Sequence, residues 1–196
     1  MPFTPFTKDD FISMRWDQYQ YQVERIFSDL MQLNIKFDFI VPIMRGGTPL
    51  AISLAHRLNV LRIMPVQYMY GAKIINGERE KTFCQLFTSI PSIKEREKEY
   101  TILVTEANHC TGKTAQSCIN HIKQILPKSK IYYATIGRAY SHKGKLDNTE
   151  FETWGFLTNE DGELTAEECD KLHIINKFTL YPWETLEGEI RDMNGE

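Results

Sequence analysis

The sequence predicts a single α/β domain, built on a mostly parallel twisted sheet with helices on both faces. Strand-length apolar runs alternate with amphipathic helical stretches, which is the pattern of such a sheet. No internal repeat, low-complexity tract or Pro/Gly-rich linker divides the chain. Its 196 residues, 42% of them hydrophobic, suffice for one core but are few for two. We therefore expect one domain spanning residues 1–196.

Individual elements follow from the spacing of apolar residues. Between 17 and 34, Val23, Ile26 and Leu30 recur at helical spacing and predict an amphipathic helix. By the same reasoning, strands are expected at 37–44, 62–70, 100–104, 131–139 and 174–181, and further helices at 50–58 and around 118–126.

Two segments do not fit the simple alternation. Asn76-Gly77 between apolar residues predicts a hairpin turn, with 81–90 as the second arm and beyond. This excursion, at about 71–99, is long for a connection and is typical of a flexible lid over an active site. The aromatic-rich segment at about 151–184 is interpreted as a small C-terminal cap.

Composition excludes several classes of protein. The net charge of −3 offers no general attraction to nucleic acid or to an anionic membrane. The start, Met1-Pro2-Phe3-Thr4, does not have the form of a signal peptide, and no stretch is long and apolar enough to span a bilayer. Four irregularly spaced cysteines indicate neither a disulfide framework nor a zinc site. We expect a soluble cytoplasmic protein with no nucleic-acid or membrane partner.

The first chemical motif is Met44-Arg45-Gly46-Gly47-Thr48-Pro49, between a predicted strand and a predicted helix. Two glycines let the backbone approach a ligand closely, and the amino end of the helix presents unpaired N–H groups to an anion. Arg45 adds positive charge. The alternative is an ordinary strand-to-helix turn with a surface arginine.

The second motif is an apolar strand that leads into Thr111-Gly112-Lys113-Thr114 and then a helix. Successive backbone amides and two hydroxyls there can surround one phosphate. The P-loop of nucleoside triphosphatases also has this character, but it requires a glycine where Ala107 stands. Gly46-Gly47 has no role in a P-loop protein either. The sequence therefore favours another class of phosphate-binding protein.

Together the two motifs resemble those of type I phosphoribosyltransferases, and the resemblance runs from about residue 16 to 184. The ending Tyr181-Pro182-Trp183-Glu184 is similar to that of the xanthine/guanine/hypoxanthine group. The resemblance implies phosphoribosyl pyrophosphate (PRPP) and a nucleobase or nucleotide as ligands, Mg²⁺ as the cofactor, and a cis peptide between Met44 and Arg45. We also expect a homodimer.

The resemblance assigns roles to individual residues. It implies that the ribose 5-phosphate is held by Thr111, Gly112, Lys113 and Thr114, and the pyrophosphate by Arg45, Gly46 and Gly47. Glu106 matches the first acid of the pair that binds the ribose hydroxyls, and is the candidate magnesium ligand. Ala107, Asn108, His109 and Cys110 lie in the same loop and are counted with the substrate-binding residues. The candidate catalytic residues are Glu106, Arg45 and Cys110.

Two positions depart from the family pattern. Ala107 stands where the second acid is expected, and Cys110 stands where purine enzymes usually carry an aspartate near the imidazole edge of the base. A thiol with its ordinary pKa of about 8.5 is a poor substitute for a carboxylate near neutral pH. The resemblance therefore implies a divergent member of this group.

Other residues admit two interpretations each. His109 could donate a hydrogen bond to a phosphate or be an ordinary exposed loop histidine, and Trp183 could be a stacking platform for a base or a core residue. Basic residues that could add charge at the site, or simply be solvated, are Lys73, Lys81, Arg138, Lys143 and Lys145; Arg138 is counted with the substrate-binding residues.

The leading hypothesis is transfer of the 5-phosphoribosyl group from PRPP to a nucleobase, preferentially a purine, giving a nucleoside 5′-monophosphate and pyrophosphate. Two alternatives stay open. One is a catalytically impaired regulatory protein of the same fold that binds PRPP or a nucleotide. The other is a transferase with an unusual acceptor.

Overall fold

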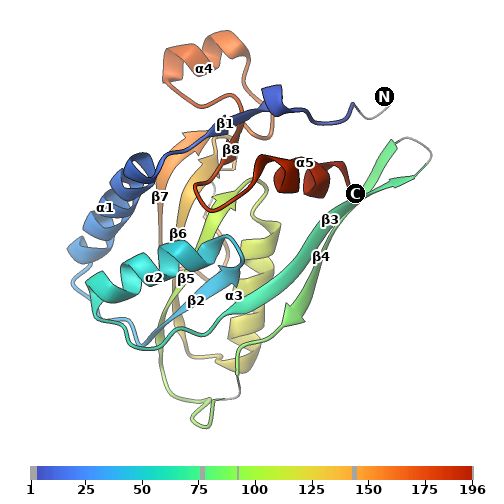
Figure 1. Ribbon diagram of the computed structural model, residues 1–196. Coiled ribbons are helices and arrows are strands. Elements are labelled where there is room, and N and C mark those ends of the chain that lie inside the picture. The colour runs from blue at the N-terminus through green and yellow to red at the C-terminus, as the bar shows by residue number, and fades with distance from the viewer. Residues whose placement is uncertain (1–3, 76–77, 92, 143–144, 196) are drawn as a thin grey trace.

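The main sheet has six strands in the order β4-β3-β2-β5-β6-β7 (Figure 1). The computed structural model describes residues 4–75, 78–91, 93–142 and 145–195, with the backbone alone at 69–75 and 78–84. Neighbouring strands are parallel except for β3 and β4. The prediction of a mostly parallel sheet is confirmed. The strands, in chain order, are β2 (Phe39–Met44), β3 (Val66–Ile75), β4 (Glu78–Thr88), β5 (Thr101–His109), β6 (Lys130–Ala139) and β7 (Phe151–Thr158).

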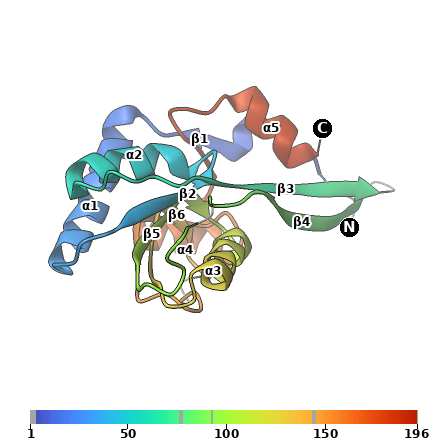
Figure 2. The ribbon, with the colours of Figure 1, turned by 90° about the horizontal axis from the view of Figure 1, so that it is seen from below.

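Helices cover both faces of this sheet, as predicted. Figure 2 shows α1 (Trp16–Gln32) and α2 (Gly47–Leu58) on one side and α3 (Lys113–Ile125) on the other. Each helix buries one stripe of side chains three or four residues apart, because such residues share a face of a helix. The stripes are Tyr19, Val23, Ile26 and Leu30 in α1, Leu50, Ala51, Leu54 and Ala55 in α2, and Ala115, Cys118, Ile119 and Ile122 in α3.

Strand β5 is longer than the apolar pattern indicated. The prediction ended this strand at Val104, but the ladder with β6 continues to the pairs Asn108↔Gly137 and His109↔Arg138. The pairing of β5 with β2 ends at Thr105, but its pairing with β6 continues and keeps the backbone extended even where the side chains become polar. Glu106 and Asn108 are therefore held on a strand and not in a loop.

The predicted excursion contains a long hairpin. β3 and β4 are antiparallel, with Ile75 opposite Glu78, and they project from the body of the protein (Figure 2). The predicted turn residues Asn76 and Gly77 lie outside the described residues. β3 begins at Val66 and not at 62, because the chain before it makes only an isolated bridge between Ile63 and Ile40.

The predicted C-terminal cap at about 151–184 is wrong in its first part. β7 occupies this part and pairs in parallel with β6 as an edge strand of the main sheet. The rest contains α4 (Ala166–Leu172) and β8 (Phe178–Leu180), and α5 (Leu186–Asn194) follows.

The two ends of the chain meet in a small second sheet. β8 pairs in parallel with β1 (Phe11–Ser13), which follows the short 3₁₀ helix η1 (Lys8–Asp10). Figure 1 shows this pair beside the main sheet, with α5 close to it. Among the described residues, no helix has the length and apolar character needed to cross a membrane.

Candidate active site

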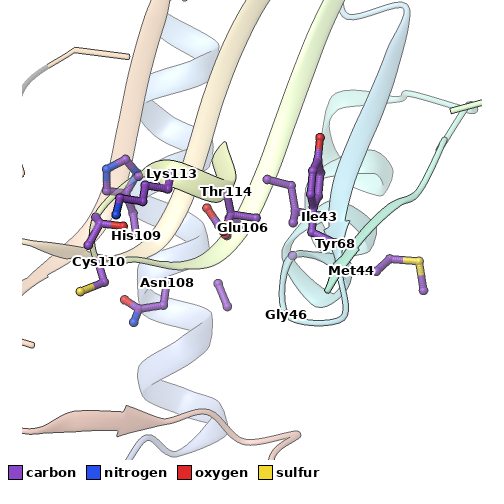
Figure 3. A pocket seen from close by; sticks show the side chains of 14 residues that line it. Ile43, Met44, Gly46, Tyr68, Glu106, Asn108, His109, Cys110, Lys113 and Thr114 are labelled. Atoms are coloured by element: carbon purple, nitrogen blue, oxygen red, sulfur yellow. The ribbon is translucent and has the colours of Figure 1, made fainter. Parts of the chain in front are cut away.

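A cavity of about 280 Å³ lies at the carboxyl ends of β2 and β5, where ligands bind in many parallel α/β sheets. It brings the two glycine-containing motifs together: Figure 3 shows Met44 and Gly46 on one side and Cys110 and Lys113 on the other. The lining residues are Ile43, Met44, Gly46, Gly47, Tyr68, Glu106, Ala107, Asn108, His109, Cys110, Thr111, Gly112, Lys113 and Thr114. Of these, Ile43 and Tyr68 were not anticipated.

The Gly46-Gly47 turn packs directly against β5. A Cβ atom on Gly47 would lie 2.2 Å from the backbone oxygen of Thr105, and one on Gly46 would lie 2.9 Å from the Cβ atom of Ala107. The Thr105 hydroxyl donates to the Gly47 carbonyl at 3.0 Å. The predicted cis peptide between Met44 and Arg45 is confirmed. Glycine at 47 is therefore required by the contact between the two loops, whatever ligand binds there.

The phosphate-type loop begins α3 with an unusual backbone. Gly112 has a φ of 70° and precedes the first helical residue, Lys113, so the amides of the first helical turn point out of the helix toward the loop. A Cβ atom on Gly112 would lie 2.7 Å from Nε2 of His109. The loop is therefore closed against the imidazole ring beneath it.

His109 is not an exposed loop histidine, and that interpretation is wrong. Its side chain is only 3% exposed, and its Nδ1 atom lies 3.1 Å from the hydroxyl of Tyr133. Burial lowers the pKa of His109 to about 3, with a further contribution from the positive charge of Arg138. The ring is therefore neutral near physiological pH and supports the loop from below.

Glu106 is the one residue of the cavity lining that carries a carboxylate, and it lies beside the two loops. Its Oε2 atom accepts a hydrogen bond from the hydroxyl of Tyr133 at 2.7 Å. Burial raises the pKa of Glu106 to about 7, and the hydrogen bond from Tyr133 opposes this rise. Near neutral pH this group can therefore exchange a proton or accept a cation. Tyr133 was missed, because it stands among other polar residues of its strand and lies 27 residues from Glu106 in the chain.

Asn108 links the cavity to the C-terminal part of the chain. Its side-chain amide donates to Oε2 of Glu160, whose Oε1 accepts from the backbone N–H of Thr179 at 3.2 Å. Nearby, the hydroxyl of Tyr181 donates to the carbonyl of Ala107 at 2.8 Å. Burial raises the pKa of Glu160 to about 7. No sequence signal pointed to Glu160, because it is 52 residues from Asn108.

Arg45 and Trp183 do not line the cavity. The guanidinium of Arg45 is exposed and lies 3.3 Å from a carboxylate oxygen of Asp192 in α5. Trp183 stacks on Tyr181, with ring centroids 5.2 Å apart and an interplanar angle of 10°, and it meets Tyr19 in an edge-to-face contact. Of the two interpretations of Trp183, the packed core residue fits this geometry.

Arg138 is not available to a ligand in this structure, which corrects its assignment as a substrate-binding residue. Its side chain is fully buried and lies 2.6 Å from a carboxylate oxygen of Glu152. Its Nε atom donates to the carbonyl of His142 at 2.9 Å, and its guanidinium lies over the ring of Trp154. A buried arginine needs this pairing, because an unpaired buried charge is very costly.

The other basic candidates do not contribute to the described cavity. Lys145 is exposed, and its ammonium group donates to the carbonyl of Glu150 at 3.4 Å. The side chains of Lys73 and Lys81 and all of Lys143 lie outside the described residues.

The residues of this site can hold magnesium only together with a ligand that supplies further oxygen atoms. The ion takes one or two protein carboxylates and completes its shell with phosphate oxygens and water. Glu106 offers one carboxylate, whereas position 107 offers only a methyl group. Among the described residues, no three His, Cys, Asp or Glu side chains gather as a metal site. The residues therefore suit an ion that arrives with a diphosphate, not an all-protein cage.

Comparisons with solved structures identify the fold. Over 90% of this chain, the structure is similar to a purine phosphoribosyltransferase from Pyrococcus horikoshii (18% identity, TM-score 0.62, 96% of that chain). It is also similar to the xanthine-guanine-hypoxanthine phosphoribosyltransferase of Helicobacter pylori (15% identity, TM-score 0.62, 92% of this chain and 98% of that one). A third similar structure is a hypothetical protein from Neisseria gonorrhoeae with bound ppGpp (15% identity, TM-score 0.66, 95% of this chain and 96% of that one).

The comparisons by sequence found nothing: no family model and no curated protein matches the chain. At the identities above, structural likeness establishes the fold and not the reaction. The agreement extends over nearly the whole length of both chains in each case. This chain therefore has the fold of the type I phosphoribosyltransferases and resembles their purine group.

Proposed function

We propose that this protein transfers the 5-phosphoribosyl group from PRPP to a nucleobase, with a purine as the preferred acceptor, and releases pyrophosphate. One observation carries the proposal. Two glycine-containing loops from distant parts of the chain line a single cavity, with the carboxylate of Glu106 also in its lining. A ligand with two separate phosphate groups and a polyhydroxylated centre suits this arrangement.

In this proposal each loop binds a different phosphate-containing group of the ligand. The amides at the start of α3 and the hydroxyls of Thr111 and Thr114 bind the 5-phosphate. The backbone of Gly46 and Gly47 binds the pyrophosphate group. Arg45 stands just outside the cavity and adds positive charge to this end once it leaves Asp192.

Glu106 has the central role in the proposed chemistry. Its carboxylate accepts hydrogen bonds from the ribose hydroxyls while Tyr133 fixes its orientation from the opposite side. Bound magnesium supplies positive charge that stabilises the departing pyrophosphate. Loss of pyrophosphate leaves a cation-like ribose carbon, so the negative charge of Glu106 favours that transition state. With its pKa near 7, Glu106 becomes fully ionised only above neutral pH or beside a cation.

A regulatory protein that binds PRPP or a nucleotide is the second candidate. Ala107 and Cys110 line the cavity at the two positions where the resemblance places acids. The phosphate-binding backbone is retained while two carboxylates are absent, which favours binding over turnover. The structure from Neisseria gonorrhoeae, with its bound ppGpp, is consistent with a nucleotide ligand for this fold.

The direct test is incubation of the full chain with PRPP, magnesium and a panel of purine and pyrimidine bases, followed by mass analysis of the products. We expect one or more purine nucleoside 5′-monophosphates and stoichiometric pyrophosphate. A Gly112→Val variant serves as the control, because its altered loop should abolish product formation. Binding of PRPP with no product from any base would support the regulatory protein instead.

Restoring the missing acids separates the two candidates further. In an active transferase, the Ala107→Asp/Cys110→Asp variant should raise turnover with a purine by about tenfold or more for each acid that forms its bond, because a charged hydrogen bond contributes about 1.5–3 kcal/mol. In a binding protein, the new charges are unpaired and should weaken both ligand binding and stability. Steady-state kinetics and thermal melting of the same preparation distinguish these results. The expected homodimer stays a prediction, which sedimentation velocity tests.

A further inference from the structure

The hydroxyl of Tyr133 lies between two residues that line the candidate active site. It donates a hydrogen bond to Oε2 of Glu106 at 2.7 Å, and it lies 3.1 Å from Nδ1 of His109. Tyr133 is on β6, and both of its partners are on the neighbouring strand β5. The side chain of Tyr133 is fully buried, so both contacts form where the dielectric constant is low and hydrogen bonds are strong.

The direction of each hydrogen bond in this chain of side chains follows from the number of protons. A phenol has one proton, and an ionised carboxylate can only accept. Because Tyr133 donates to Glu106, its oxygen is left to accept from His109, so Nδ1 of His109 carries a proton. Burial, with smaller contributions from the charges of Arg138 and His142, lowers the pKa of His109 to about 3 and keeps the ring neutral. A neutral imidazole has one N–H, so the other ring nitrogen, Nε2, is an acceptor.

Nε2 of His109 faces the turn that begins α3. A Cβ atom on Gly112 would lie 2.7 Å from this nitrogen and 3.3 Å from Cδ2 of Leu146, so the turn rests on both side chains. The backbone of the turn offers N–H groups, because the first amides of a helix have no partner within the helix. A bare Nε2 can accept a hydrogen bond from such an N–H, and a protonated Nε2 cannot. The tautomer of His109 therefore decides whether the ring can hold the turn from below.

We propose that Tyr133 is a positioning residue that links Glu106 to the turn at Gly112: its hydroxyl fixes the tautomer of His109 in which Nε2 accepts a hydrogen bond from the turn. The assignment rests on the proposed function, because there this turn binds the 5-phosphate. It adds a physical link between the carboxylate and the turn, through which a change at Glu106 reaches the phosphate-binding backbone.

Two variants of the full chain at Glu106 test this link, because both are uncharged at every pH. Glu106→Gln keeps an oxygen that can accept from Tyr133, whereas Glu106→Met is of similar length and has no such oxygen. NMR of the histidine ring nitrogens shows which nitrogen of His109 carries the proton. At alkaline pH we expect a protonated Nδ1 in the parent chain and in Glu106→Gln. In Glu106→Met the proton of Tyr133 is free to turn to Nδ1, so we expect the proton of His109 on Nε2.

The affinity for inorganic phosphate, measured by calorimetry, tests the consequence for the turn. Glu106→Met should bind phosphate about fivefold more weakly than Glu106→Gln, because the turn loses one hydrogen bond. Tyr133→Phe breaks the same link at its centre and should weaken the affinity of the parent chain to a similar extent. The control is Tyr132→Phe, which removes a hydroxyl on the opposite face of β6 and should change neither the tautomer nor the affinity.

The outcomes separate the link from the proposed function. The link is overturned if His109 carries its proton on Nε2 in the parent chain, or if Glu106→Gln and Glu106→Met have the same tautomer or the same affinity for phosphate. If Glu106→Met does not fold, an unchanged phosphate affinity in Tyr133→Phe overturns it instead. A parent chain that binds no phosphate would contradict the proposed function, and the NMR comparison, which needs no ligand, would still decide the link.

Discussion

Replacing Glu106 with glutamine should stabilise the protein at alkaline pH while it impairs the proposed function. Burial raises the pKa of Glu106 from 4.5 to about 7 in the folded chain. Between these values the folded state binds more protons than the unfolded state, so the free energy of unfolding falls as the pH rises. The difference of about 2.5 pKa units corresponds to a loss of about 3 kcal/mol, complete above about pH 7.

Glutamine at 106 removes this loss, because it is uncharged at every pH and its carbonyl can still accept the hydrogen bond from Tyr133. The variant should therefore gain about 3 kcal/mol over the parent chain at about pH 8 but only about 1 kcal/mol at about pH 5.5. Comparison with the parent cancels the similar pH dependence expected from Glu160 and Glu184, whose pKa values burial also raises to about 7.

Urea unfolding at both pH values measures these differences directly. Glu163→Gln, at an exposed position, is the matched control and should show no pH-dependent gain. An equal gain for Glu106→Gln at both pH values, or a loss of stability at about pH 8, would refute the reasoning. PRPP binding in the presence of magnesium should weaken in the same variant, which marks Glu106 as a residue retained for function at a cost in stability.

Three further predictions concern the loops and the core. Gly112→Val should weaken PRPP binding more than about tenfold, because its Cβ atom would meet His109 at 2.7 Å. Gly162→Val is the control in the same calorimetric measurement, because Gly162 also has a positive φ, of 71°, but has nothing within 4 Å of the new Cβ atom. Equal affinities of the two variants for PRPP would contradict the prediction. Arg45→Ala should weaken the binding of PRPP far more than the binding of a nucleoside monophosphate, which lacks the pyrophosphate group. Asp192→Ala should not weaken the binding of PRPP. If Arg45→Ala weakened the binding of both ligands equally, the arginine would be structural. Glu152→Ala should destabilise the protein by about 3–5 kcal/mol in urea unfolding, because it leaves the buried charge of Arg138 unpaired. A change below about 1 kcal/mol would mean that Arg138 finds another partner.

The layers of the fold and the two glycine-containing loops could be predicted from the sequence. Both are local signals. The apolar stripes of α1, α2 and α3 repeat every three or four residues, and the glycines at 46, 47 and 112 stand in short continuous motifs. Even the cis peptide between Met44 and Arg45 followed from such a motif, through its resemblance to known proteins.

Which polar side chains lie at the cavity depends on contacts between distant parts of the chain, and the sequence did not reveal them. Arg138 looks like a ligand-binding residue in the sequence, but it pairs with Glu152 on the neighbouring strand. The two residues are 14 apart in the chain, and no sequence pattern at that spacing predicts an ion pair. Glu160 reaches Asn108 across 52 residues, and β5 stays extended through Glu106 because its pairing with β6 continues past Thr105. A charged group settles where folding provides its partner, since burial without one is costly. That partner is chosen by the packing of distant strands and not by the neighbouring residues in the chain.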